Sequence, residues 1–185
     1  MSESYSTRFC ARYDDCEYVS LTDEEYRTAI SRGEDTYRHS QSRGMKDYRS
    51  FVRDGVDGCR VQCLGSIAEF AAAKLLGVRL SGWMNTFKGS DLSGNIEVRL
   101  IGAEHYGLRV YDRDRDSRRV IGVVIPKGRE REPYRIPGWI PAGIAKIEEY
   151  RMDPLNRGHP FFCVPQSRLI PVSTLAGLLK SENNR

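Results

Sequence analysis

One segment of the sequence is apolar at almost every position: Arg-Val-Ile-Gly-Val-Val-Ile, residues 119–125. A strand with one face in solvent alternates apolar and polar residues, whereas a strand covered on both faces is apolar throughout. The run is rich in β-branched residues, and Pro126 ends it because proline cannot donate to a sheet. We therefore expect a central strand here, and with it an α/β fold: an α+β mixed sheet flanked by helices.

The remaining elements expected from the sequence are a mixture of helices and strands. A helix capped by Ser20 or Thr22 runs toward Gly33. The highly charged residues 34–58, with a break at Ser42, are expected to form a second short helix and a loop. Apolar residues recur at helical spacing over 59–77, where Gly77 ends the helix. Strands are expected at residues 83–87, 96–101, 108–111 and 161–165, and a short helix at 172–180, followed by a frayed tail.

Two further segments predict connections rather than regular elements. Acids and bases alternate over residues 111–119, which predicts a solvated hairpin between core strands; the alternative is a second acidic site or a phosphate-binding loop. Residues 137–143 are rich in Pro and Gly, which predicts a turn segment in which Trp139 packs rather than stacks on a base.

The composition is typical of one globular domain. The chain has 185 residues, of which 39% are hydrophobic and 29% charged. It has no apolar run near the roughly 20 residues of a membrane span. Its first residues lack the apolar stretch of a signal peptide, so we expect a cytoplasmic protein, in which five cysteines do not form a disulfide framework. We expect a single domain, 1–185: a helical, charged N-terminal extension (1–58), a core (59–171), and a C-terminal helix and tail (172–185).

The segment Asp-Leu-Ser-Gly-Asn-Ile-Glu-Val-Arg, residues 91–99, places two carboxylates and a cation around one turn. Side chains alternate along a strand, so Glu97 and Arg99 project from one face and Val98 from the other. Together Asp91 and Glu97 can hold a hard divalent cation, with a positive group alongside for a phosphate or a water. The alternative is a β-hairpin in which Glu97 and Arg99 form an ordinary charge pair.

Glu69 lies on the expected helix among small residues. Small side chains let another element approach closely, and if that element is the 91–99 hairpin, Glu69 becomes a third acidic group beside Asp91 and Glu97. Carboxylates that close repel one another unless they share a cation or a proton, which favours a metal site. The alternative is an amphipathic helix with Glu69 at its solvated border. The small neighbours are Gly65, Ser66, Ala72 and Ala73.

A helix glutamate, an aspartate before a turn, and Glu-x-Lys on the next strand are the motifs of the PD-(D/E)XK nuclease superfamily, which this chain resembles over residues 65–166. It also resembles phage and prophage proteins of that superfamily that carry Glu-Val-Arg, then Leu-x-Val-x-x-x-Asp (here 108–114) and Gly-Trp-Ile (here 138–140). The resemblance implies a restriction-endonuclease-like core that binds Mg²⁺ or Mn²⁺. Its catalytic and metal-binding residues would be Glu69, Asp91, Glu97, Arg99 and, through its carbonyl, Val98.

Arg99 departs from the family motif. The family's lysine positions or activates the attacking water, whereas an arginine stays protonated and cannot act as a base, although its fork of donors can hold a phosphate. A metal-bound water needs no lysine, because the cation lowers the pKa of the water. Lys88 is a second source of an ammonium group, or else an ordinary solvated turn lysine.

The sequence is compatible with three functions. The first is metal-dependent hydrolysis of DNA phosphodiesters by a phage protein. The second is a non-catalytic protein on a degenerate nuclease scaffold, which binds nucleic acid or protein through the charged residues 38–60 and 113–119. The net charge of +4 permits nucleic-acid binding without requiring it. A third possibility is a phage protein that blocks a host enzyme through its surface.

Overall fold

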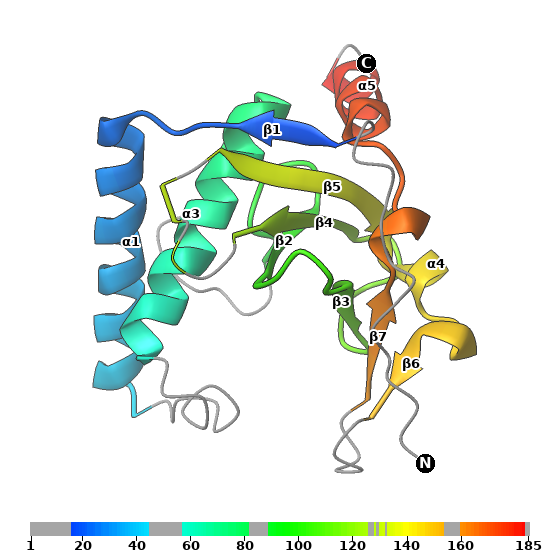
Figure 1. Cartoon of the computed structure of the whole chain (residues 1–185), viewed down its shortest axis with the longest axis horizontal. Coiled ribbons are helices and arrows are strands. Elements are labelled where there is room, and N and C mark those ends of the chain that lie inside the picture. The colour runs from blue at the N-terminus through cyan, green and yellow to red at the C-terminus, as the bar shows by residue number, and fades with distance from the viewer. Residues whose placement is uncertain are drawn as a thin grey trace.

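The computed structural model describes residues 16–44, 57–81, 89–125, 128, 130, 131, 133–153 and 160–183. In Figure 1, α1 and α3 lie beside one another at one end of the molecule, and a small sheet lies at the other end. The elements in chain order are β1 (Glu17–Val19), α1 (Asp23–Ser42), α3 (Gly58–Leu76), β2 (Ile96–Ile101), β3 (Leu108–Tyr111), β4 (Arg119–Val124), β5 (Tyr134–Pro141), α4 (Ala142–Ala145), β6 (Arg151–Met152), β7 (Phe161–Val164) and α5 (Val172–Asn183).

The described strands form two sheets. The larger sheet is mixed, in the order β1-β5-β4-β2: β4 runs parallel to β2 and antiparallel to β5, and β1 is antiparallel to β5. The smaller sheet, in the order β3-β7-β6, is antiparallel. β4 is an inner strand and is buried from Val120 onward. The expected central strand and the mixed α/β class are therefore confirmed.

The two faces of the larger sheet have different covers. Ile121 and Val123 of β4 pack into a core shared with α1, α3 and α5. Val120 and Val124 pack into a second core shared with β3, β7 and α4. Helices thus cover one face, and the small sheet with α4 covers the other (Figure 1). In β2, Val98 belongs to the helix-side core, so its neighbours along the strand project from the opposite face.

The two long helices begin and end on clear local signals and cross at a glycine. Thr22 caps α1 through a capping box with Glu25. α3 ends at Gly77, whose φ of 65° suits glycine. A Cβ at Gly33 would lie 2.4 Å from the Cα of Cys63, so this glycine lets the helix backbones touch. The expectation that the first helix stops near Gly33 is wrong: α1 continues to Ser42 because packing on α3 compensates for the low helix propensity of glycine. The second short helix and loop expected over residues 34–58 fall largely on residues 45–56, which lie outside the described residues.

Residues 137–143 were expected to form turns, but residues 134–141 form the buried strand β5. Pro137 is tolerated because the register with β4 shifts between Gly122 and Val124, and a bulge needs no donor at the extra residue. Trp139 packs, as expected: it is 5% exposed and its Nε1 donates to Thr174 at 2.9 Å.

The solvated hairpin expected at residues 111–119 is also wrong. β3 and β4, which flank this segment, belong to different sheets, and Asp114 within it is 4% exposed. The strands expected at 96–101, 108–111 and 161–165 are confirmed, and so is the C-terminal helix, which extends to Asn183. The expected strand at 83–87 and Lys88 lie outside the described residues. None of the helices in the described part of the chain is both long and apolar enough to cross a membrane.

Candidate active site at the edge of β2

A tight turn brings Asp91 alongside the strand that follows it. Leu92 pairs with Ile96 across the turn, in which Gly94 and Asn95 both have positive φ. One carboxylate oxygen of Asp91 accepts a hydrogen bond from the backbone N–H of Val98 at 2.8 Å. β2 pairs only with β4 within the described strands, so this N–H points to the open edge. In an extended strand the carbonyl of a residue points the same way as its N–H, which places the Val98 carbonyl on the Asp91 side.

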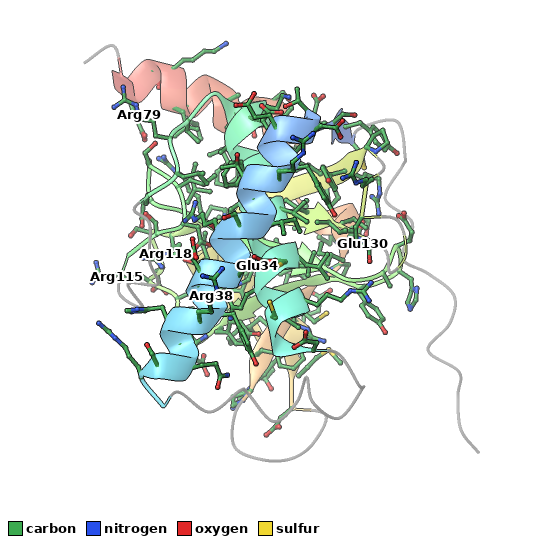
Figure 2. All side chains as sticks on the ribbon, turned by 90° about the vertical axis from the view of Figure 1, so that its left-hand side faces the viewer. Glu34, Arg38, Arg79, Arg115, Arg118 and Glu130 are labelled. Atoms are coloured by element: carbon green, nitrogen blue, oxygen red, sulfur yellow. The ribbon has the colours of Figure 1, made fainter. Side chains whose placement is uncertain are left out.

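Glu97 projects from the face opposite the helices and holds two guanidinium groups. One carboxylate oxygen pairs with Arg99. The other accepts from Nη1 of Arg118 at 2.8 Å, and the same nitrogen donates to the carbonyl of Gly89 at 3.0 Å. Both oxygens of Glu97 are therefore occupied by arginines from the chain itself. Figure 2 views the molecule from the side of α1 and shows Arg118 closer to the body of the molecule than Arg115 of the same loop.

Arg99 is fixed by three groups besides the strand that carries it. Its Nη2 donates to Asp114 at 3.0 Å, its Nη1 pairs with Glu97, and its guanidinium lies 5.3 Å from the ring centre of Tyr111. Asp114 in turn accepts the backbone N–H of Tyr111 at 2.9 Å. Burial by itself would lower the pKa of Arg99, but the carboxylates of Glu97 and Asp114 raise it above its usual value. Arg99 therefore stays a cation and cannot serve as a base.

Glu69 approaches this edge from the other side of the sheet. It lies on α3, and one of its carboxylate oxygens is 3.1 Å from Nη2 of Arg32 on α1. Because α3 covers the face opposite to Glu97, Asp91 stands between the two glutamates at the open edge of β2. The three carboxylates influence one another but do not converge. Among the described residues, no three His, Cys, Asp or Glu side chains are grouped closely enough to hold a metal ion.

The pKa values report this crowding. Burial and the nearby charge of Asp91 raise the pKa of Glu69 from 4.5 to about 8, against the lowering effect of Arg32. Burial and the charge of Glu97 raise the pKa of Asp91 from 3.8 to about 6, against the hydrogen bond from Val98. Buried carboxylates shift in this way when their negative charge is not fully balanced. A cation bound at this edge would favour the ionised form of both carboxyls.

The donor types suit a hard divalent cation, although the side chains would have to move closer together to bind one. Mg²⁺ and Mn²⁺ prefer oxygen ligands, and the oxygens available at this edge are the second oxygen of Asp91, the carbonyl of Val98 and the carboxylate of Glu69. Glu97 is a fourth candidate, but only after at least one of its arginine partners has left. The arrangement therefore fits such a cation in charge and ligand type, while Glu97 is engaged elsewhere.

Three residues of this site were not among the candidates chosen from the sequence: Arg32, Asp114 and Arg118. For two of them a signal was present. Asp114 ends the Leu-x-Val-x-x-x-Asp motif, and Arg118 lies in the 111–119 run, for which a phosphate-binding loop was the alternative interpretation. No pattern in the sequence points to Arg32, because only the packing of α1 on α3 brings it to Glu69.

Comparisons with known proteins add no relative to this picture: no family model, no curated protein and no solved structure matches the chain.

Proposed function

We propose that this chain hydrolyses phosphodiester bonds of DNA with the help of Mg²⁺ or Mn²⁺, on a restriction-endonuclease-like core. The observation that carries the proposal is the set of partly buried acids, Glu69, Asp91 and Glu97, at the open edge of β2 next to the fixed cation Arg99, where burial and then the neighbouring carboxylates raise the pKa of Glu69 and of Asp91. Carboxyls with strongly raised pKa values are enriched at functional sites.

The ligands in this proposal are Asp91, Glu97 and the carbonyl of Val98, with Glu69 directly or through a water. A bound divalent cation would lower the pKa of a water and polarise the phosphate. Arg99 binds the scissile phosphate and stabilises the charge that develops on it, since Asp114 and Tyr111 hold the guanidinium in place beforehand. Because Arg99 cannot accept a proton, its role is electrostatic.

Cleavage of plasmid and single-stranded DNA with Mg²⁺ or Mn²⁺ tests the proposal. Glu97→Ala should lose all cation-dependent cleavage, and Glu97→Gln should do the same while keeping the shape of the side chain. Glu148→Gln is the matched control, because its side chain is 85% exposed and pairs only with the nearby Arg151 among the contacts described. A fully active Glu97→Gln variant with an intact fold would refute the assignment.

One observation favours a second candidate, a non-catalytic protein that binds nucleic acid or protein on a degenerate nuclease scaffold. Both oxygens of Glu97 are engaged by Arg99 and Arg118, so the charge that the family uses for a cation is here balanced internally. This candidate predicts salt-sensitive DNA binding without any metal.

Calorimetric titration with Mn²⁺ separates the two candidates. Mn²⁺ binding that Asp91→Ala abolishes, and that the exposed control Asp116→Ala keeps, would support the enzyme; the side chain of Asp116 is 77% exposed. DNA binding that is unchanged by EDTA, together with no heat of Mn²⁺ binding, would support the binding protein.

A further inference from the structure

Two arginines, not one, surround the oxygens of Glu97. Arg99 comes from β2 itself, and Arg118 comes from the loop that leads into β4. The side chains of both are mostly buried, at 19% and 11% exposure, yet each retains some accessible surface. A pair of guanidiniums around a single planar oxyanion has the form of a phosphate-binding site, in which the carboxylate stands where phosphate oxygens would lie.

The carboxylate does not satisfy these arginines completely. Within the described part of the chain, the Nε of Arg99 and the Nε of Arg118 are buried and have no hydrogen-bond partner. A buried donor without an acceptor destabilises the arrangement that contains it. A carboxylate offers two oxygens, whereas a phosphodiester offers more acceptors in a tetrahedral arrangement. Both side chains therefore have unused donors that a phosphate could engage after a small rotation.

The surroundings keep Arg118 in place without using up its guanidinium. Besides Glu97, its side-chain partner among the described residues is the carbonyl of Gly89, and both bonds are made by the same nitrogen, Nη1. Its backbone is fixed as well, because the carbonyl of Arg118 accepts from the N–H of Ala142 at 2.8 Å. An arginine held by its backbone and by one nitrogen is pre-organised, while none of the contacts among the described residues uses its Nη2 or its Nε.

We propose that Arg118 is a second phosphate-binding residue, which acts with Arg99 on the same phosphate group of a nucleic-acid strand and which Glu97 holds in position until the strand binds. The inference rests on the proposed function for the identity of the substrate, but it concerns binding and needs no cleavage. Glu97 cannot serve a cation and both arginines with the same two oxygens. Cation binding at Glu97 and phosphate binding at the arginines should consequently strengthen each other.

The test measures the binding of a fluorescein-labelled oligothymidylate by anisotropy, in EDTA and in Ca²⁺, which takes the same oxygen ligands as the proposed cations. Ca²⁺ should tighten binding by the wild type. Arg118→Ala should weaken binding by about tenfold and remove the effect of Ca²⁺. Arg115→Ala is the matched control: it is an exposed arginine three positions away in the same loop, and it should cost about twofold.

The salt dependence separates phosphate contact from a merely structural role. Losing one phosphate contact to a single strand reduces the slope of log affinity against log salt by about 0.7. A variant that only lowers the folded fraction leaves that slope unchanged. Arg118→Lys keeps the positive charge beside Glu97 but not the forked donors of the guanidinium. It should therefore have the salt slope of the wild type and only part of the wild-type affinity.

Equal losses in Arg118→Ala and Arg115→Ala, or an unchanged slope in Arg118→Ala, would overturn the proposal, as would a wild type that does not bind the oligothymidylate. These outcomes are independent of the cleavage assay. A wild type that binds through Arg118 but cuts no DNA would overturn the enzyme and keep this inference. A wild type that cleaves DNA, with an Arg118→Ala variant that binds and cleaves normally, would keep the proposed enzyme and overturn the role of Arg118.

Discussion

Two acidic regions of this chain lie next to each other and balance their charge in different ways. In the loop of residues 112–116, the ammonium of Lys146 donates to the backbone carbonyls of Asp112 and Asp114 and to the carboxylate of Asp116. At the edge of β2, Glu69 pairs with the guanidinium of Arg32, yet burial and the neighbouring carboxylates still raise the pKa values of Glu69 and Asp91. The charges of the loop are matched by Lys146, whereas the cations near Glu69 and Asp91 do not offset the burial and mutual repulsion of these acids.

The two regions differ in their role. The loop is a structural support, because Lys146 and the N–H of Gly143 fix its backbone; the N–H of Gly143 donates to the carbonyl of Asp116 at 3.0 Å. In this conformation Asp114 accepts from Arg99. The edge of β2 is left with charges that are costly to keep, because burial removes the water that would solvate them. The loop therefore supports Arg99, and the chemistry that we propose takes place at the edge of β2.

The largest effect is expected from breaking the link between the two regions. Asp114→Ala removes a buried partner of Arg99 and the acceptor for the N–H of Tyr111, so the free energy of unfolding should fall by about 3 kcal/mol. Urea unfolding measures it. Asp112→Ala is the matched control, since its side chain is exposed and only its backbone carbonyl meets Lys146. Equal effects of the two substitutions would show that the loop does not support Arg99.

The next effect tests whether the ammonium holds the loop. Lys146→Met leaves two backbone carbonyls without their donor, and the free energy of unfolding should fall by about 2 kcal/mol, as expected for hydrogen bonds to a charged group. Lys180→Met on the exposed side of α5 is the control and should have little effect. A Lys146→Met variant as stable as wild type in urea would contradict the role given to the ammonium.

Patterns that depend only on neighbouring residues predicted much of the fold. The apolar run of β4, the turn before β2 and the alternation that sends Glu97 and Arg99 to one face are all confirmed. Failures occurred where distant packing overrides a local signal. Gly33 was expected near a helix end but sits where α1 crosses α3, and Pro137 was expected in a turn but sits at a bulge in a buried strand.

The candidate site was predictable only in part for the same reason. Asp91 and Glu97 are joined by one short turn, so their proximity follows from local geometry. Arg32 and Arg118 reach the site through contacts between α1 and α3 and through the loop before β4, which no spacing in the sequence encodes. The alternation of charge at residues 111–119 is typical of solvated loops, and one buried carboxylate, Asp114, makes the difference here.

The pH dependence of stability tests the excess charge at the edge of β2. The folded-state pKa of Glu69, about 8, lies above its usual value of 4.5, so the folded state binds the proton more tightly. Its contribution is fully present below pH 4.5 and is lost as pH rises toward 8. Stability should therefore fall by up to about 1.4 kcal/mol per pH unit from this group between pH 6 and 7.

Glu69→Gln isolates that contribution. The variant should show a flatter dependence of the urea midpoint on pH than wild type, while Glu148→Gln, whose side chain is 85% exposed, should follow wild type. Since a cation at the site would favour the ionised carboxylates, Mn²⁺ should also flatten the wild-type curve. A Glu69→Gln curve parallel to that of wild type would mean that the edge of β2 carries no uncompensated charge.

The smallest effect distinguishes two ways in which Lys146 could hold its loop. If the backbone carbonyls do the holding, Asp116→Asn should change the free energy of unfolding by less than about 0.5 kcal/mol, because an ion pair with a carboxylate that is 77% exposed contributes little. Urea unfolding at low and high salt measures it. If Asp116→Asn were as damaging as Lys146→Met, and if salt weakened the wild type equally, the loop would depend on a solvent-exposed ion pair. The loop and the edge of β2 would then both rely on side-chain charges, and the division between support and chemistry drawn above would no longer hold.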